Sequence, residues 1–421
     1  MNTNIIAVKM FSFGSFLQNQ VLPKLLKTFR QHHIIYPYIE AVLIVCYRWA
    51  IWLNPSLVEA HYRLGQLFQK QHQWQKAATA FEQVTKIGSF ELADAYGNLG
   101  RVLSKLKKYE ESIAALHQAI TLEPHHYGYY RFLGDTLSDK GKIDEAVNIY
   151  QIASQKRIYK THPQVLLKYQ IKKTLTAPNF MIIGQVKCGT SSLYRYLTQH
   201  PQILPAIKKE VQFWNLKSHS KRKLDWYLSH FPAISSEQNL ITGEATPYYF
   251  NCQSTAKQVF RLFPNLKLII LLRNPIDQVV SHYYMKVRIN REKLSLKQAI
   301  FSGLFNSIQL ANNDLTNHCN NNRYLKNGIY IEMISEWMKI FPKKQFLIVK
   351  SEDFFTNSAT TVKQIFQFLE VESYQLQEYS NSSRGNYPPL SQSMRHTLGD
   401  YFRPFNQQLE EYLDRKFNWD Y

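Results

Sequence analysis

The stretch FMIIGQVKCGTSSL, residues 180–193, decides the fold of the C-terminal part of this chain. Four apolar residues lead into Gly184, and a short loop with a lysine and a second glycine leads to three hydroxyl residues. This order predicts a buried strand, a tight loop and the first turn of a helix. Backbone N–H groups and the positive end of a helix dipole favour an anion at such a turn. We therefore expect a phosphate-binding loop.

The loop differs from the P-loop pattern G-x-x-x-x-G-K-[ST] in the position of its lysine. Gly184 and Gly189 have the P-loop spacing, but Thr190 stands where the P-loop has lysine. The lysine of this loop, Lys187, comes two residues before the second glycine. A P-loop kinase or triphosphatase is therefore only an alternative prediction. The residues expected to hold phosphate are Lys187, Cys188, Gly189, Thr190, Ser191 and Ser192.

Alternating apolar runs and helical patterns follow Pro178. The runs at 180–183, 266–272 and 345–349 are each followed by a helical pattern. This alternation predicts an α/β domain over 178–421, P-loop-like, with a central parallel sheet between two helical layers. Ligands of such domains bind at the carboxyl ends of the strands.

An internal repeat precedes this domain. Leu-Gly pairs at 64–65, 99–100 and 133–134 recur at intervals of 35 and 34 residues. Twelve residues after each glycine comes a small residue, and sixteen after it a large one: Ala77, Ser112 and Ala146, then Phe81, Leu116 and Tyr150. The pattern resembles the tetratricopeptide repeat, a pair of antiparallel helices.

The repeat predicts the domain organisation of the N-terminal part. Residues 1–23 are expected to be an extension, and 24–177 an all-α array. Within the array we expect a degenerate repeat at 24–57, three repeats over 58–160 and a capping helix at 161–176. Such arrays often bind a protein or peptide on their concave face. A passive spacer or dimerisation element is the alternative.

Two further segments carry candidate site residues. In LLRNPIDQVVSHYY, residues 271–284, Arg273 ends a strand and Ser281 follows two turns into the next helix. An arginine fork and a hydroxyl so placed can bind a phosphate. In KKEVQFWN, residues 208–215, Glu210 stands beside two lysines and is a candidate general base.

Together, in this order, these segments resemble the sulfotransferase family, in particular its heparan-sulfate and carbohydrate branch. The matching patterns are G-x-x-K-x-G-T-[ST]-[ST]-L at 184–193, K-E-x-x-F-[FW] at 209–214, E-x-T-P-x-Y-F at 244–250, R-[ND]-P with a following S-x-Y at 273–283, and a basic residue before glycine at 384–385. The resemblance covers about residues 178–421. Two positions depart from the heparan-sulfate pattern: Ala245 replaces a common lysine, and Gln212 a common histidine.

The resemblance implies a sulfuryl donor, 3′-phosphoadenosine 5′-phosphosulfate, and no metal. It implies that the hydroxyl residues 190–192 hold the 5′-phosphate, that Arg273 and Ser281 hold the 3′-phosphate, and that Arg384-Gly385 closes over the nucleotide. Because there is no γ-phosphate, Lys187 is expected to neutralise the bridging oxygen as the phosphosulfate bond breaks.

For catalysis, the resemblance implies that Glu210 accepts the proton of an acceptor hydroxyl. His282 is an alternative base, since cytosolic relatives use a histidine. The expected acceptor is a glycan or another hydroxyl compound, and a protein tyrosine is a second candidate. A repeat scaffold with an inactive C-terminal domain is a further alternative.

Charge and cysteine content limit the partners and the compartment. The net charge of +20 indicates an anionic partner, but no long lysine- or arginine-rich run suggests nucleic acid. The four cysteines have no paired spacing, which favours a reducing compartment, so we expect a cytoplasmic protein. The most apolar segment, 41–53, is too short to span a bilayer.

Overall fold

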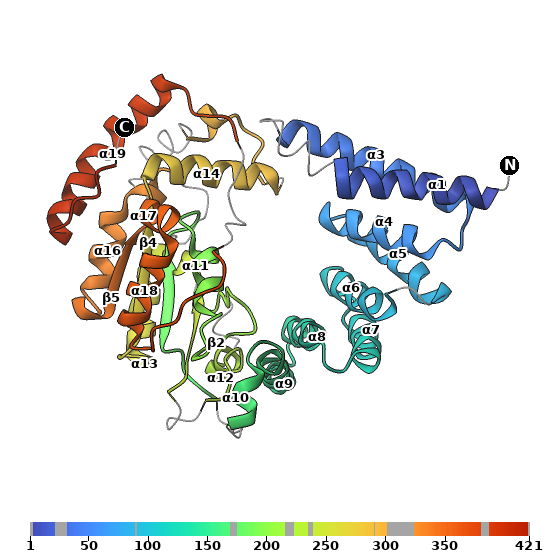
Figure 1. Cartoon of the computed structure of the whole chain (residues 1–421), viewed down its shortest axis with the longest axis horizontal. Coiled ribbons are helices and arrows are strands. Elements are labelled where there is room, and N and C mark those ends of the chain that lie inside the picture. Colours follow the sequence, from blue (N-terminus) through green and yellow to red (C-terminus); the bar gives the residue numbers. More distant parts are fainter. Residues whose placement is uncertain are drawn as a thin grey trace. The chain divides into compact units, whose positions relative to one another are not determined.

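The computed structural model forms two compact units, which are described separately (Figure 1). It describes residues 3–21, 32–88, 91–168, 175–214, 223–234, 239–289, 291–300, 324–379 and 387–419. The first unit is Met1–Lys160 with Asn386–Pro388, and the second is Thr161–Gly385 with Pro389–Tyr421. The division falls before the expected boundary at Pro178. The short helix α10 (Pro163–Lys168), in the segment expected to cap the array, therefore groups with the second unit.

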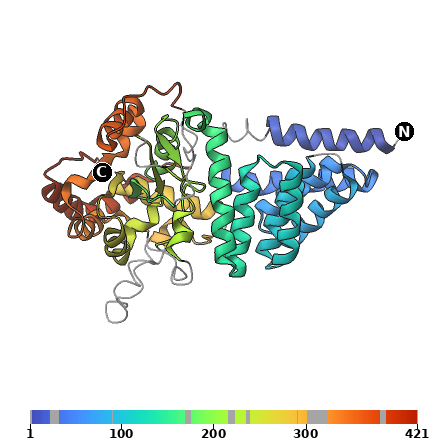
Figure 2. The same ribbon diagram turned by 90° about the horizontal axis from the view of Figure 1, so that it is seen from below.

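Three helix pairs follow the predicted repeats over 58–160, and Figure 2 shows the successive helices side by side. This confirms the all-α array. The helices are α4 (Val58–Lys70), α5 (Trp74–Ile87), α6 (Leu92–Lys105), α7 (Tyr109–Leu122), α8 (Tyr127–Lys140) and α9 (Ile143–Thr161).

The repeated glycines allow the two helices of each pair to approach closely. A Cβ atom on Gly100 would lie 2.5 Å from the Leu116 side chain, and one on Gly134 would lie 2.5 Å from Tyr150. Each of these large residues comes sixteen positions after its glycine. Since a carbon atom cannot pack at that distance, the glycine and the large residue form one packing unit. This contact is the physical reason for the sequence repeat.

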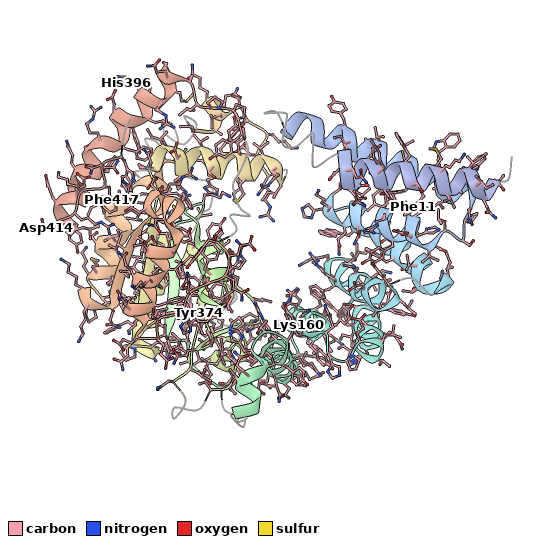
Figure 3. The ribbon with its side chains drawn as sticks, in the orientation of Figure 1. Phe11, Lys160, Tyr374, His396, Asp414 and Phe417 are labelled. Carbon is pink, nitrogen blue, oxygen red and sulfur yellow. The ribbon has the colours of Figure 1, made fainter. Side chains whose placement is uncertain are left out.

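The N-terminal segment is also helical and packs on the array. Helix α1 (Thr3–Phe16) leads into a π-helical turn, η1 (Leu17–Val21), and contacts α3 (His32–Leu53). Phe11 of α1, labelled in Figure 3, lies against Tyr47 of α3, with ring centroids 5.7 Å apart. The Tyr47 hydroxyl also donates to Gln18 Oε1 at 2.7 Å. The expected extension therefore supplies the helix that pairs with α3, so residues 3–21 extend the array.

The second unit contains a five-stranded parallel sheet, as predicted. The strand order is β2-β3-β1-β4-β5. The three predicted apolar runs form its strands β1, β4 and β5, whereas β2 and β3 come from segments without a predicted strand. The bounds are β1 (Phe180–Gly184), β2 (Ile203–Pro205), β3 (Ile241–Ala245), β4 (Lys267–Leu272) and β5 (Phe346–Lys350).

Helices cover both faces of this sheet, which confirms the three-layer α/β fold. Helices α11 (Thr190–Leu197) and α18 (Ser358–Leu369) join β1 and β4 in one apolar core. On β1, the 3-10 helix η3 (Pro247–Asn251) packs through Phe250, whose carbonyl accepts from Trp337 Nε1 of α16 (Tyr330–Met338) at 3.2 Å. The other elements are α12 (Leu224–Leu228), α13 (Gln253–Leu262), α14 (Pro275–Arg288), η5 (Lys326–Gly328), η6 (Lys343–Gln345), α17 (Ser351–Thr356) and α19 (Gln392–Leu413).

The residues that follow α19 pack against other elements of the second unit. Asp414, labelled in Figure 3, ends this helix in a left-handed conformation, and the buried ring of Phe417 stacks on Trp419. The Trp419 indole donates to Glu352 Oε2 at 3.3 Å, and Glu352 Oε1 accepts from the backbone N–H of Asn274 at the start of α14. The C-terminal segment thus supports the end of β4. Within the described ranges, no helix has both the length and the apolar composition of a bilayer span.

Candidate active site

The loop after β1 makes a tight turn into α11. Lys187 and Gly189 have φ angles of 69° and 97°, in the left-handed region. A Cβ atom on Gly189 would also lie 2.8 Å from the Phe355 ring, so glycine is required there. Side chains from other elements fix the turn: Gln278 donates to Val186 O at 3.0 Å, Arg273 to Lys187 O at 3.4 Å and Ser351 to Cys188 O at 2.8 Å.

The three hydroxyl residues form the first turn of α11, where the unpaired N–H groups of a helix lie. Thr190 and Ser192 are buried, and Ser191 is exposed. The predicted strand, loop and helix start are therefore present, with the hydroxyls at the helix N-terminus. This arrangement can bind a phosphate through backbone N–H groups and hydroxyls together.

Three cationic side chains lie close enough to Lys187 to influence its charge. Burial and, to a smaller extent, the positive charges of Arg288, Arg273 and Lys209 together lower the pKa of Lys187 to about 8. Arg288 is the exposed last residue of α14, seven positions after Ser281. Like charges repel one another unless an anion lies between them. The cluster is therefore suited to a multiply charged anion.

Arg273 is held where β4 ends and α14 begins. Its carbonyl accepts from the Tyr330 hydroxyl at 2.8 Å, and its guanidinium lies 5.8 Å from the Phe355 ring centroid. Asn274 caps α14 by accepting from Ile276 N at 3.0 Å. The structure thus brings Arg273 to the Lys187 loop. Ser281 is buried on α14, two turns after this cap.

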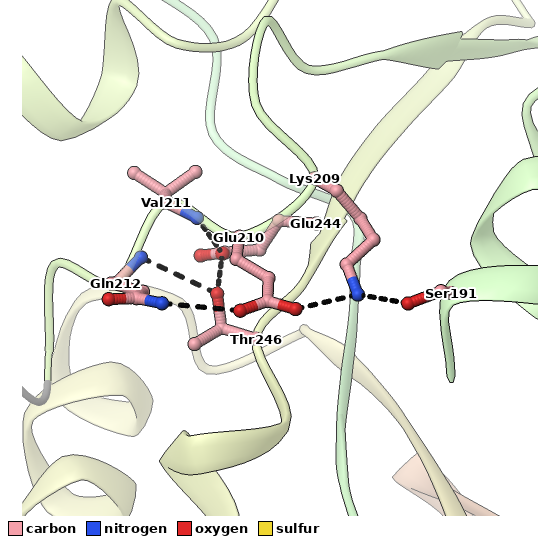
Figure 4. A network of polar contacts seen from close by, with 7 residues as sticks. All are labelled: Ser191, Lys209, Glu210, Val211, Gln212, Glu244 and Thr246. Atoms are coloured by element: carbon pink, nitrogen blue, oxygen red, sulfur yellow. Dashed lines mark hydrogen bonds and ion pairs between the residues drawn. The ribbon is translucent and has the colours of Figure 1, made fainter. Parts of the chain in front are cut away.

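Glu210 lies beside the same loop, in the segment between β2 and β3 (Figure 4). Its Oε1 atom is 2.7 Å from Lys209 Nζ, and its Oε2 atom accepts from Gln212 Nε2 at 3.2 Å. The Lys209 ammonium also donates to Ser191 Oγ at 2.6 Å. A chain of contacts therefore joins the candidate base to the first turn of α11.

A second, buried carboxylate holds the backbone that follows Glu210. Glu244 of β3 accepts through Oε2 from Thr246 Oγ1 at 2.5 Å and from Val211 N at 3.1 Å (Figure 4). Its Oε1 accepts from Tyr227 at 2.7 Å and from Tyr249 at 3.2 Å. Burial raises the pKa of Glu244 to about 7, and these hydrogen bonds oppose the rise. Glu244 thus fixes the segment of the candidate base.

The alternative base, His282, is fully buried. Burial and the charges of Lys286 and Lys187 lower the pKa of His282 to about 3, so its ring is neutral. Its Nδ1 atom lies 3.3 Å from Asn327 Nδ2. A side chain without exposed surface is poorly placed to take a proton from an acceptor. The predicted pair Arg384-Gly385 lies outside the described residues.

Comparison with protein families identifies the domain that carries this site. Residues 177–403, more than half of the chain, match the family model described as "Sulfotransferase domain". The chain belongs to the sulfotransferase family. Residues 59–87 and 93–126 match models of the tetratricopeptide repeat, so the array that precedes the sulfotransferase domain consists of such repeats.

Relatives of this sulfotransferase come from several organisms. The membrane-associated sulfotransferase kil1 of Dictyostelium discoideum is 26% identical over 319 residues, 59% of this chain and 67% of its own. The human bifunctional heparan sulfate N-deacetylase/N-sulfotransferase 3 is 29% identical over 56% of this chain and 30% of its own, so the match spans under a third of that relative. Human carbohydrate sulfotransferase 15 is 27% identical, and the match covers 58% of this chain and 54% of that relative.

One solved structure, a sulfotransferase from Alicyclobacillus acidocaldarius, is 28% identical to this chain. It covers 57% of this chain and 98% of its own, with a TM-score of 0.49.

The sequence did not identify three residues as contributors to this sulfotransferase site: Arg288, Glu244 and Lys209. Arg288 had a usable signal, because it lies two turns after Ser281 on one helix. Glu244 was recognised only as part of the E-x-T-P motif, because the donors that it binds come from other segments. Lys209 was recognised only as a neighbour of Glu210, because its contact with Ser191 depends on tertiary structure. Among the described residues, no group of three or more histidine, cysteine or acidic side chains could hold a metal ion.

Proposed function

We propose that this protein transfers a sulfuryl group from 3′-phosphoadenosine 5′-phosphosulfate to a hydroxyl group of a glycan-like acceptor. The observation that carries the proposal is the position of Lys187. Its desolvated ammonium lies at the N-terminus of α11 among three further cations, and Lys209 and Ser191 connect that turn to Glu210. A donor with two separate phosphate positions fits a site with cations on both the α11 and the α14 side.

Each part of the site has a proposed role toward the donor. The N-terminus of α11, with Thr190 and Ser192, holds the 5′-phosphate. Arg273 and Ser281 hold the 3′-phosphate, which distinguishes this donor from ATP. Lys187 neutralises the charge that develops on the bridging oxygen, so the protein contributes mainly orientation and charge stabilisation.

The acceptor reacts in line with the bond that breaks. The acceptor oxygen forms a new bond to sulfur as the bond from sulfur to the bridging oxygen breaks. The proton of the acceptor hydroxyl passes to the Glu210 carboxylate, and 3′-phosphoadenosine 5′-phosphate leaves. The hydrogen bond from Gln212 to Oε2 orients this carboxylate.

A glycan-like acceptor is supported by the names of the relatives. Two of them are named for heparan sulfate and carbohydrate sulfotransferase activities. The basic character of the chain suits an anionic polysaccharide. We also propose that the repeat array binds a protein or peptide partner, which is a common use of such arrays.

A thermal-shift comparison tests the donor assignment. A ligand of the folded state raises stability by RT ln(1 + [L]/Kd), about 2.7 kcal/mol at a hundredfold excess over Kd. We expect a clear rise in Tm with 3′-phosphoadenosine 5′-phosphate without magnesium, and a much smaller rise with ATP. The absence of any shift with the bisphosphate would overturn the proposal.

Binding of the bisphosphate should weaken as the pH rises above about 8. The pKa of Lys187 is lowered to about 8 in the free site, so its ammonium loses its proton above this pH. An anionic ligand favours the charged form, which raises this pKa and makes binding take up a proton. Below pH 8 the lysine is already charged, so the affinity there is highest.

Titration calorimetry at pH 7.5, 8.5 and 9.5, in buffers of different ionisation enthalpy, measures this uptake. The affinity should fall by up to about tenfold per pH unit above 8. Lys187→Arg, which keeps its charge throughout, is the control and should give a flat profile. An equal slope in this variant would assign the titration to another group.

Arg273→Ala should weaken the bisphosphate about ten- to a hundredfold, since a charge-assisted hydrogen bond contributes about 1.5–3 kcal/mol. If Arg273 contacts the 3′-phosphate, adenosine 5′-monophosphate, which lacks this group, should bind the variant and the wild type alike. Arg403→Ala, which removes an exposed arginine paired with Asp400, is the matched control. An equal loss for both nucleotides would place Arg273 elsewhere.

A further inference from the structure

The backbone of Lys209 is attached to the central sheet. Its carbonyl accepts from Ala245 N, at the end of β3, at 2.9 Å. Two residues further on, Val211 N donates to the buried Glu244 carboxylate of the same strand. Lys209 and Glu210 therefore extend from a fixed backbone, and only their side chains can adjust readily.

The Lys209 ammonium lies between two functional groups (Figure 4). It is 2.6 Å from Ser191 Oγ and 2.7 Å from Glu210 Oε1, and its side chain is 25% exposed. An ammonium group carries three N–H donors, and these contacts use two of them. Ser191 belongs to the first turn of α11. An anion bound at this turn is therefore within reach of the same ammonium group.

We propose that Lys209 binds the anionic oxygens of the donor and, in doing so, releases the Glu210 carboxylate. This inference rests on the proposed function. Before the donor binds, the ammonium pairs with Glu210 and so occupies an oxygen of the base. A phosphosulfate at α11 carries more negative charge than one carboxylate and attracts the ammonium more strongly. Glu210 is then free for the acceptor hydroxyl only when the donor is in place.

The test is the affinity for 3′-phosphoadenosine 5′-phosphate, measured by calorimetry in the wild type and three variants. Lys209→Met should weaken binding ten- to a hundredfold, and Lys209→Arg should bind within about threefold of wild type. Lys208→Met is the matched control, because its ammonium faces the Trp226 ring at 5.9 Å, and it should bind as wild type does. Circular dichroism and Tm verify the fold of each variant.

The release of Glu210 has its own signature in a double-mutant cycle. Glu210→Gln should tighten bisphosphate binding by about threefold, because it removes the competing partner of Lys209. In the Lys209→Met background the same change should have no effect. Additive effects would overturn the coupling, and normal affinity of Lys209→Met would overturn the donor contact. If the wild type itself fails to bind the bisphosphate, the proposed function fails before this inference is reached.

Discussion

Lys187→Ala should lower the rate of sulfuryl transfer by about a thousandfold. Removal of one group that stabilises a developing oxyanion commonly lowers kcat by about 10²–10³, and here the lost group carries a full charge. The remaining cations near the loop, Arg273, Arg288 and Lys209, belong to other elements, and their charges act on the lysine itself. We therefore expect no other side chain to replace Lys187 at the bridging oxygen.

The measurement is the transfer of labelled sulfate from the donor to a cell-extract fraction that the wild type sulfates. Deletion of residues 1–160, which keeps α10 with the second unit, shows in a parallel assay whether the repeat array selects that acceptor. Lys208→Ala removes the same charge from a neighbouring surface position and should keep its activity. A rate for Lys187→Ala within tenfold of wild type would mean that another group stabilises the leaving phosphate.

The parts of the fold that were predicted from the sequence are those with local signals. The glycines of the repeats and the large residues sixteen positions later contact each other within one helix pair. Their spacing in the sequence was therefore sufficient to predict the helix pairs. Strands β1, β4 and β5 are largely apolar, and β1 and β4 are almost wholly buried. Strand β3, ITGEA, is short and contains a glycine and a carboxylate, which disfavour a strand prediction. Its burial depends on donors from distant segments.

The site was predictable to a similar extent. The loop at 184–193, Arg273 and Glu210 each lie in a recognisable motif, and the structure brings all three to the carboxyl ends of parallel strands. The motifs do not reveal which side chains from other segments hold these site residues in place. Tyr227 contacts Glu244 across a separation of 17 residues, and Lys209 contacts Ser191 across 18. Such contacts follow from the completed tertiary structure.

Glu210→Gln is the second decisive substitution. It should lower turnover by about 10²–10⁴, the usual contribution of general acid–base catalysis, because an amide cannot accept the acceptor proton. Affinity for the bisphosphate should not fall, since the carboxylate is the partner of Lys209 and not of the donor. A loss confined to turnover distinguishes a base from a residue that holds the nucleotide.

The structure supplies a reason to expect a stable variant. Glu210 is 30% exposed, and its contacts are one ion pair and one hydrogen bond from Gln212, so the fully buried Glu244 and not Glu210 anchors this segment. Glu370→Gln, which removes an exposed carboxylate paired with Lys267 at 3.0 Å, is the matched control for charge. Unchanged turnover in Glu210→Gln would assign the proton to another acceptor. His282 would be a poor candidate for that acceptor, since it is buried and neutral.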